Sequence, residues 1–445
     1  MQRGNHYLFT RSESALTQNS LSHGTAVKLT GDWGASVGSK QSHELQVSKA
    51  TVLGENDAEG NPLQPKYQTP EHLRTIPHLR ARLPTNALVL RLRSQLIAAL
   101  TNFFNQEDFV QTHTPIITSS DCEGAGEVFT VSSNAAKDSI QKSKPEDEAQ
   151  VEHFFRTTKY LTVSAQLHLE ALAQAVSKVW TLSPTFRAEL SDTPRHLSEF
   201  YMLEAEMCFV HDLGEIMDLV ENMLRSAVAA LQASPIWGEL LKMKQAMPRE
   251  DVEDDRFVGV EALQQRWGGL AARDWPRISY SDAILILGDA YSKDPARFAF
   301  EPFYADGLQV EHERYLASAI GQGKPLFVTD YPTMQKPFYM APSVPATDGT
   351  GPLHTVACFD LLVPDLCELV GGSLREHRSQ ELMAAMQLKG VAGNNLGWYQ
   401  DLRKYGSVPH GGFGLGFDRL VCYLAGVSNV RDVVAFPRWH RRCDC

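Results

Sequence analysis

The stretch Gly411-Gly-Phe-Gly-Leu-Gly-Phe417, followed directly by Asp418-Arg419, decides which fold the chain can adopt. Its glycines alternate as G-x-G-x-G, which is neither the turn of a dinucleotide-binding fold nor a G-x-x-x-x-G-K-[ST] phosphate loop. Alternating glycines leave one face of a strand bare for a flat ligand, or they let a helix pack closely on it. We therefore expect a strand over 411–416, a helix over 417–424 and no dinucleotide fold.

The elements expected around this stretch define an α+β fold. Apolar runs predict strands at 114–118, 160–163, 179–182, 186–189, 200–210, 325–328, 338–340 and 354–362. Helical spacing predicts helices over 86–104, 166–178 and 212–231, the second capped by Ser164 and the third by an Asp212–Glu215 box. Because few strands alternate with helices, we expect a mostly antiparallel sheet flanked by helices.

The first set of candidate functional residues consists of arginines and an aromatic residue. Phe186-Arg187-Ala188-Glu189 precedes a loop that contains Arg195-His196, and Phe200 follows on the return strand. A planar guanidinium matches phosphate oxygens, and an aromatic ring can stack on a purine with Arg419 on the other side. The residues alone leave open a surface Arg187–Glu189 ion pair and a core position for Phe200.

Two carboxylates and an arginine form a second group. Asp360 and Glu368 are hard oxygen ligands suited to magnesium beside a triphosphate, and Arg375 follows a glycine pair that leaves room for a small polar ligand. A salt-bridge network among the same side chains is an equally good interpretation of the residues alone.

Composition bounds the class of protein. The chain has 445 residues, 43% of them hydrophobic and 21% charged, so collagen-like, coiled-coil and wholly disordered chains are excluded. No apolar run is long enough to cross a bilayer, so we expect no membrane association. Seven widely spaced cysteines without a C-x-x-C motif indicate a reducing compartment, and Cys443 and Cys445 read as two exposed thiols.

Charge is unevenly distributed. The net charge of −11 argues against indiscriminate coating of nucleic acid. Between Lys66 and Arg93, however, six cations face only Glu71, which predicts either a solvated linker or a phosphate-contacting patch. We expect a disordered or targeting segment over 1–25, a small β module over 26–65, a basic hinge over 66–85 and one large domain over 86–445 with a surface insertion at 134–152.

Together the motifs resemble those of a known family. Thr114-Pro115, the segment from FRAE to Phe200, and GLGFDR look like motifs 1, 2 and 3 of class II aminoacyl-tRNA synthetases. The sequence around these motifs is similar to that of asparaginyl-tRNA synthetases over about residues 40–438. It includes 122–129 (CEGAGEVF), 161–170 (LTVSAQLHLE), 195–200 (RHLSEF), 336–340 (KPFYM), 360–364 (DLLVP), 368–375 (ELVGGSLR) and 408–413 (VPHGGF).

The resemblance implies an enzyme that activates L-asparagine with ATP and Mg²⁺ and then charges tRNA(Asn). It assigns Arg187 to the α-phosphate, Arg419 to the γ-phosphate, Arg195 and His196 to the outer phosphates, Glu189 to the adenine side, Phe200 to stacking on the base, Asp360 and Glu368 to magnesium, and Glu127, Ser164 and Gln166 to the amino acid. It also implies a homodimer formed through motif 1, the helix around 91–104 and the strand at Pro115.

Asparagine is favoured over aspartate by two positions. Leu169 stands where the aspartyl pattern has a lysine, and Glu204 stands where the asparaginyl pattern has a carboxylate that accepts from the substrate amide and repels aspartate. Arg375 can donate to the amide oxygen. An aspartyl or non-discriminating synthetase, and a paralogue that binds tRNA or nucleotide without charging, remain the alternatives.

Three features depart from the family pattern. The N-terminal β module matches only the last part of an anticodon-binding OB barrel, Leu190 replaces the asparagine of FRAEN, and motif 3 has Asp418 where glutamate is commoner.

The Trp439–Cys445 tail resembles that of fungal mitochondrial members of the family. We therefore expect the protein in the mitochondrial matrix, with the cytoplasm as the alternative.

Overall fold

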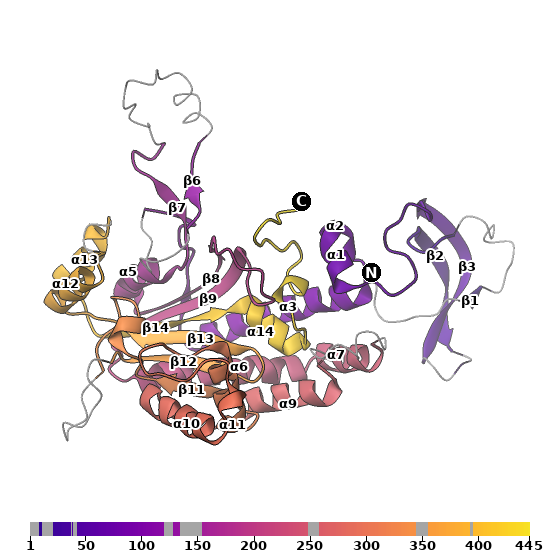
Figure 1. Cartoon of the computed structure of the whole chain (residues 1–445). Helices are drawn as coiled ribbons and strands as arrows, with labels where there is room; N and C mark the ends of the chain where they lie inside the picture. Colours follow the sequence, from indigo (N-terminus) through magenta and orange to yellow (C-terminus); the bar gives the residue numbers. More distant parts are fainter. Residues whose placement is uncertain are drawn as a thin grey trace, which may run out of the picture. The chain divides into compact units, whose positions relative to one another are not determined.

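The computed structural model describes residues 9–10, 21–36, 38, 42–119, 128–133, 154–247, 258–343, 355–391 and 395–445. The chain divides into two compact units, Met1–Arg80 and Ala81–Cys445 (Figure 1). This division falls inside the segment expected as a hinge. The expected targeting segment and surface insertion lie almost wholly outside the described residues.

The N-terminal unit is built on a long hairpin. Its elements are β1 (Phe9–Thr10), β2 (Ala26–Ala35), β3 (His43–Gly54), α1 (Pro70–Thr75) and α2 (Pro77–Arg80), with strand order β1-β3-β2. Gly31-Asp32, whose residue types favour a turn, lies inside β2. The strand continues through a register shift there, because a Cβ at Gly31 would lie 2.0 Å from the Gln46 carbonyl oxygen and only glycine fits.

The second unit, Ala81–Cys445, contains an eight-stranded sheet of order β10-β11-β12-β13-β14-β9-β8-β4. Its six central strands pair antiparallel, and β10 and β4 join the edges in parallel. The strands are β4 (Val110–Gln111), β8 (Lys178–Phe186), β9 (Glu199–Cys208), β10 (Arg277–Ser279), β11 (Leu326–Thr329), β12 (Cys358–Val363), β13 (Cys367–Leu374) and β14 (His410–Gly416). The expected antiparallel α+β architecture is confirmed.

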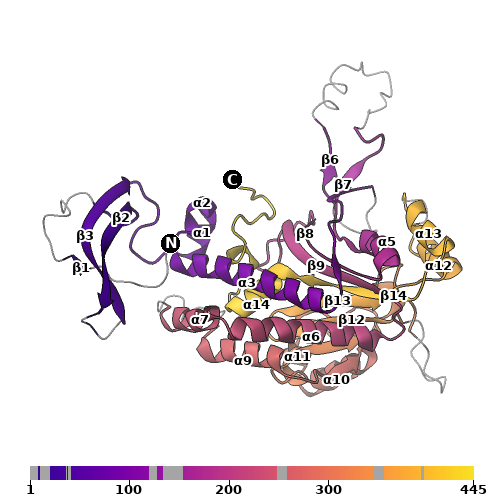
Figure 2. The same cartoon turned by 180° about the vertical axis from the view of Figure 1, so that it is seen from behind.

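Helices surround this sheet. They are α3 (Pro84–Gln106), α5 (Gln166–Val176), α6 (Leu213–Gln232), α7 (Pro235–Gln245), α9 (Val260–Ala271), α10 (Tyr280–Lys293), α11 (Val310–Ala319), α12 (Ser379–Leu388), α13 (Gly397–Lys404) and α14 (Phe417–Ala425), with short 3-10 turns at Pro295–Arg297, Thr333–Gln335 and Val430–Asp432. Helices α6, α9 and α10 cover one face of the sheet (Figures 1 and 2). The predicted capping box of α6 is present, and its apolar stripe enters the main core.

Several predicted boundaries need correction. Residues 186–189 do not form a separate strand, because β8 continues to Phe186 and the chain then leaves the sheet. Residues 338–340 form no strand; only Met340 makes an isolated bridge, to Arg375. Helix α5 ends two residues early because Ser177 adopts φ +71°, and β13 was not expected at all.

A second, small sheet holds β5 (Ile117–Thr118), β7 (Lys159–Leu161) and β6 (Thr130–Val131) in the order β5-β7-β6. The expected strand at 160–163 is therefore shorter than predicted. Within the part of the chain that the structure describes, no helix has the length and apolar character needed to span a membrane.

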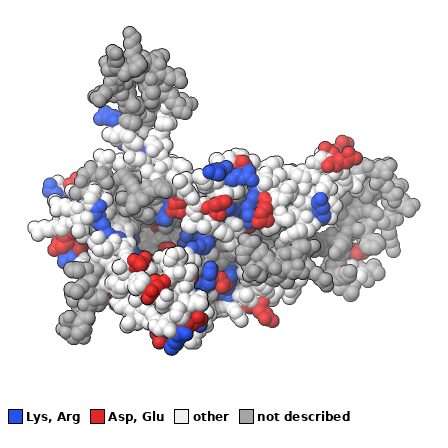
Figure 3. Space-filling view, viewed as in Figure 1, with Lys and Arg blue, Asp and Glu red and all other residues white. Residues whose placement is uncertain are grey.

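The basic stretch from Lys66 to Arg93 does not form a free cationic patch. Arg80 is buried, Arg91 pairs with Glu239, and Arg93 pairs with Asp418. On the face shown in Figure 3, basic and acidic side chains are interspersed and not segregated. These three of its six cations are therefore buried or paired within the fold, and phosphate contact by this stretch stays a prediction.

Candidate functional site

The site lies on the face of the large sheet opposite α6. Along β9, Phe200, Met202, Glu204 and Glu206 alternate toward this face, while Leu203 and Ala205 point into the main core. The alternation places one aromatic ring and two carboxylates in a row.

Glycines of β14 shape the same surface. Gly414 pairs with Glu204 of β9 and Gly371 of β13 and lines the cavity, as the glycine pattern predicted. Glycine is required at position 412 for a different reason, because a Cβ there would lie 2.2 Å from Glu206 Oε2 and 2.1 Å from the Ala205 carbonyl oxygen. The bare strand therefore accommodates both a ligand surface and a buried glutamate.

One end of the site is a cavity of about 120 Å³ lined by the predicted nucleotide residues. They are Arg187, Glu189, Arg195, His196, Phe200, Glu368 and Arg419. The Arg187 guanidinium lies 5.8 Å from the Phe200 ring centroid, and its Nη1 lies 3.8 Å from Glu189 Oε1. Arg419 Nη1 donates to the Glu368 carbonyl oxygen at 2.9 Å.

His196 lies beside Glu189 in this cavity. Its Nε2 is 3.5 Å from Glu189 Oε2, and its Nδ1 is 3.0 Å from Ser191 Oγ. Burial lowers the pKa of His196, although the Glu189 carboxylate opposes that effect. The imidazole is therefore mainly neutral at neutral pH and acts there as a hydrogen-bonding group.

The other end is a cavity of about 200 Å³ lined by Ser164, Gln166, Leu169, Glu204, Asp360 and Arg375. Arg187, Met202, Glu368 and Gly414 line both cavities, so the two ends adjoin. Glu204 accepts hydrogen bonds from Ser164 Oγ at 2.5 Å and from the Ala165 amide at 2.9 Å. Glu127, also predicted for this end, lies outside the described residues.

Arg375 is held by a partner that the sequence did not suggest. Its Nη2 lies 3.0 Å from Glu206 Oε2, its Nε donates to the same carboxylate, and its Nη1 donates to Ser373 Oγ at 2.6 Å. Burial by itself would lower the pKa of Arg375, but the Glu206 carboxylate outweighs it and raises that pKa. Strand alternation from Phe200 is the signal that would have found Glu206.

Acidic side chains gather where the two cavities meet. A Cβ at Gly371 would lie 3.5 Å from Glu368 Oε1 and 3.6 Å from Asp360 Oδ1, so these carboxylates flank the glycine. Asp360 also binds Lys336 Nζ at 2.7 Å. Burial, together with the charges of Glu368 and Asp360, raises the pKa of Glu313 to about 7. Lys336 opens the quoted stretch 336–340 but was assigned no role there, and Glu313 was missed because it stands in no motif.

Asp418 anchors the site to the rest of the domain. It accepts a hydrogen bond from the Tyr201 amide at 2.7 Å and pairs with Arg93 of α3, whose guanidinium lies 4.7 Å from the Phe417 ring centroid. The acid at this position of motif 3 therefore ties α14 to β9 and α3.

Comparison with known proteins agrees with this geometry. A model of the tRNA synthetases class II (D, K and N) matches residues 70–440. The mitochondrial asparagine–tRNA ligase of Saccharomyces cerevisiae is 41% identical over 91% of this chain and 80% of that protein. The asparagine–tRNA ligase of Desulfotalea psychrophila is 42% identical over 94% of this chain and 84% of that protein.

A solved structure is similar over nearly the same length. Asparaginyl-tRNA synthetase from Pyrococcus horikoshii, complexed with asparaginyl-adenylate, superimposes with a TM-score of 0.75 and 30% identity, covering 94% of this chain and 83% of that chain. With its antiparallel sheet and its three motifs, the chain belongs to the class II tRNA synthetases of the D, K and N group. Within that group it belongs to the asparaginyl-tRNA synthetases.

Proposed function

We propose that this chain is an asparagine–tRNA ligase. The asparagine carboxylate attacks the α-phosphorus of ATP, pyrophosphate leaves, and the asparaginyl group then passes from the adenylate to the terminal adenosine of tRNA(Asn), releasing AMP. The observation that carries this proposal is the pair of adjoining cavities on the glycine-lined sheet, one lined by arginines and Phe200 and the other by Glu204 and Arg375.

The nucleotide end supports positioning and charge stabilisation as the source of catalysis. No side chain has to act as a nucleophile in this reaction, so the chain needs groups that hold the reactants and offset charge on the phosphates. Arg187, which lines both cavities, suits the α-phosphate at their junction. Arg419, Arg195 and His196 suit the outer phosphates, Glu189 suits the adenine side, and Phe200 suits stacking on the base.

Magnesium fits the acidic junction of the two cavities. Asp360 and Glu368 flank Gly371 with oxygen atoms, which are the ligands that magnesium prefers, and Glu313 adds a third acid nearby. When bound, the ion offsets phosphate charge. Lys336 also pairs with Asp360.

The amino-acid end favours asparagine. Leu169 supplies no cation to a substrate carboxylate, the charge of Arg375 is already balanced by Glu206, and Glu204 adds a buried negative charge. A neutral side-chain amide can donate to Glu204 and accept from Arg375, whereas the Glu204 carboxylate would repel a substrate side-chain carboxylate.

Exposed side chains and sequence features support an assembly and a compartment. Apolar side chains are exposed on and after α3, including Leu90, Ile116 and Ile117, and they support a homodimer formed through motif 1. Light scattering tests this, and a monomeric mass would refute it.

The N-terminal segment has few acidic residues, and one relative is mitochondrial; both observations support the mitochondrial matrix. Cell fractionation tests this, and a purely cytoplasmic pool would refute it.

ATP–pyrophosphate exchange tests the function directly. We expect exchange with asparagine and little with aspartate, followed by charging of tRNA(Asn). Comparable exchange with aspartate would favour a non-discriminating enzyme, and no exchange would favour a non-charging paralogue.

Arg187→Ala gives a sharper test of the nucleotide end. Loss of one preorganised donor at the reacting phosphate should slow exchange by about 10²-fold or more. Arg297→Ala, which removes an exposed arginine of an Asp294 ion pair, is the matched control and should exchange normally. Wild-type exchange by Arg187→Ala would refute its assignment to the α-phosphate.

A further inference from the structure

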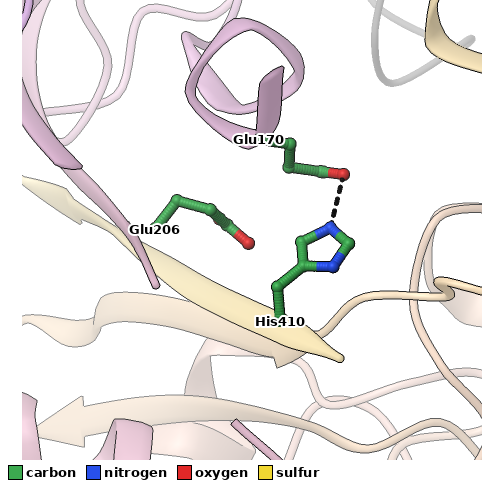
Figure 4. A group of neighbouring side chains, drawn as sticks. All are labelled: Glu170, Glu206 and His410. Atoms are coloured by element: carbon green, nitrogen blue, oxygen red, sulfur yellow. Dashed lines mark hydrogen bonds and ion pairs between the residues drawn. The ribbon is translucent and has the colours of Figure 1, made fainter. Parts of the chain in front are cut away.

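Behind the amino-acid cavity lies a buried polar network that the proposed reaction does not use. Glu170 of α5 is fully buried, and its Oε2 accepts from Arg403 Nη2 at 2.6 Å and from Tyr399 Oη at 2.7 Å. His410 Nε2 lies 3.1 Å from the same oxygen, as Figure 4 shows. The other oxygen, Oε1, accepts from Gln166 Nε2 at 3.0 Å.

This surrounding keeps Glu170 ionised. Burial by itself would raise the pKa of Glu170, but the charge of Arg403 and the hydrogen bond from His410 outweigh it and hold that pKa well below its usual range. An ionised carboxylate has no proton to donate, so it acts only as a hydrogen-bond acceptor.

The acceptor-only character of Glu170 fixes the direction of Gln166. A glutamine amide has one NH₂ end and one oxygen end, and only the NH₂ end can bind a carboxylate. The Gln166 oxygen must therefore point away from Glu170, and Gln166 lines the amino-acid cavity. An oxygen presented there can accept from a protonated α-amino group, whereas an NH₂ group would oppose it.

A metal site is the competing interpretation of the network. Glu170, Glu206 and His410 bring three ligand atoms within 4.8 Å of one another. However, each carboxylate already faces a guanidinium, Glu170 that of Arg403 and Glu206 that of Arg375. Both carboxylates are fully buried, and all four of their oxygens already accept hydrogen bonds from side chains of the network, so it is balanced as an ionic cluster without a metal ion.

We propose that Glu170 is a positioning residue that orients the Gln166 amide so that its oxygen receives the α-amino group of the substrate. Helix α13 contributes to this through Tyr399 and Arg403, so it supports the amino-acid cavity from behind. The inference rests on the proposed function, because it takes an α-amino acid as the ligand of this cavity.

The test compares asparagine with succinamic acid, which is the same molecule without the amino group. Calorimetry on the full-length chain gives the preference for asparagine as a ratio of dissociation constants. Glu170→Gln lets the Gln166 amide bind in either direction, so we expect this ratio to fall about tenfold or more. Affinity for succinamic acid and the KM for ATP should change less than about twofold.

The exchange variant Gln166→Glu/Glu170→Gln is the rescue. The new amide at position 170 donates to the new carboxylate at 166, whose second oxygen faces the cavity, so the preference should return. This variant keeps the total charge of residues 166 and 170. It therefore tests the positioning role even if Glu170→Gln does not fold.

Distinct outcomes separate the inference from the proposed function. An unchanged ratio in Glu170→Gln, an equal loss of both ligands, or no recovery in the exchange variant would overturn the role of Glu170. Failure of the wild-type chain to bind asparagine at all would instead overturn the proposed function.

Discussion

We expect the choice of substrate to depend most directly on Glu204. It is buried beside the amino-acid cavity, and Ser164 and Ala165 hold its carboxylate in place. Glu204→Gln removes the negative charge that we expect to repel aspartate, and it keeps the size of the side chain. We expect the preference for asparagine over aspartate in ATP–pyrophosphate exchange to fall about tenfold or more, since a buried charge a few ångströms away is worth at least that factor.

Glu199→Gln is the matched control, because Glu199 lies on the same strand but is exposed. It should leave the preference unchanged. Equal selectivity in Glu204→Gln and wild type would remove Glu204 from the selection of substrate.

Individual site residues could be predicted from the sequence when a motif carried them. Arg187, Phe200, Asp360, Glu368 and Arg419 were placed by the motifs, and all of them line the two adjoining cavities. Their supporting partners could not be predicted in the same way. Glu206 and Glu170 meet Arg375 and Arg403 across 169 and 233 residues of sequence, and only the folded chain brings such residues together.

The contact between α5 and α13 makes the stability of the fold depend on pH. The His168 ring of α5 stacks on Trp398 of α13, with centroids 5.3 Å apart, and burial lowers the pKa of His168 from its ordinary value of 6.5. A histidine with a lowered pKa in the folded state stabilises the fold above pH 6.5. Its contribution is lost as the pH falls from there through the folded pKa, because the unfolded chain binds the proton more readily.

We therefore expect His168→Gln to lose less thermal stability than wild type between about pH 7.5 and 5.5. The measurement is the melting temperature of each protein at about pH 7.5 and at about pH 5.5, and the difference between these two values is compared between the variant and wild type. Glu313, with its raised pKa of about 7, acts in the opposite direction in this window, so the variant must be compared with wild type and not with a calculated curve. Parallel losses in the two proteins would contradict the prediction.

Strands and helices could be predicted where the hydrophobic period was clear. The stripe of α6 and the strand β9 follow their periods closely. Strand β13 was missed because Gly371 and Gly372 interrupt its apolar pattern. Gly372 is required there by tertiary packing, since a Cβ would lie 2.5 Å from the Phe359 ring. Close approach to a neighbouring strand leaves no local signal beyond the glycine itself.

The division into two units has a functional consequence. Every member of the four hydrophobic core clusters lies at residue 88 or later, and the described site residues lie between 164 and 419. The unit Met1–Arg80 has few buried apolar side chains among its described residues, namely Val47, Leu63, Leu73 and Pro77. The sequence indicated this small β module by its composition and turn residues, but it could not indicate how the strands pair.

A chain that begins at Ala81 should therefore separate the two steps of the reaction. It retains the core and both cavities, so we expect ATP–pyrophosphate exchange with asparagine within about threefold of the full chain. Charging of tRNA(Asn) should fall about tenfold or more, because the removed unit is the one expected to contact the anticodon and contacts of that kind supply much of the affinity for RNA. Exchange and steady-state charging are measured on the same preparation, so that loss of folded protein lowers both together. An equal loss of both activities would show that the N-terminal unit supports the catalytic fold, and unchanged charging would show that it has no part in holding the tRNA.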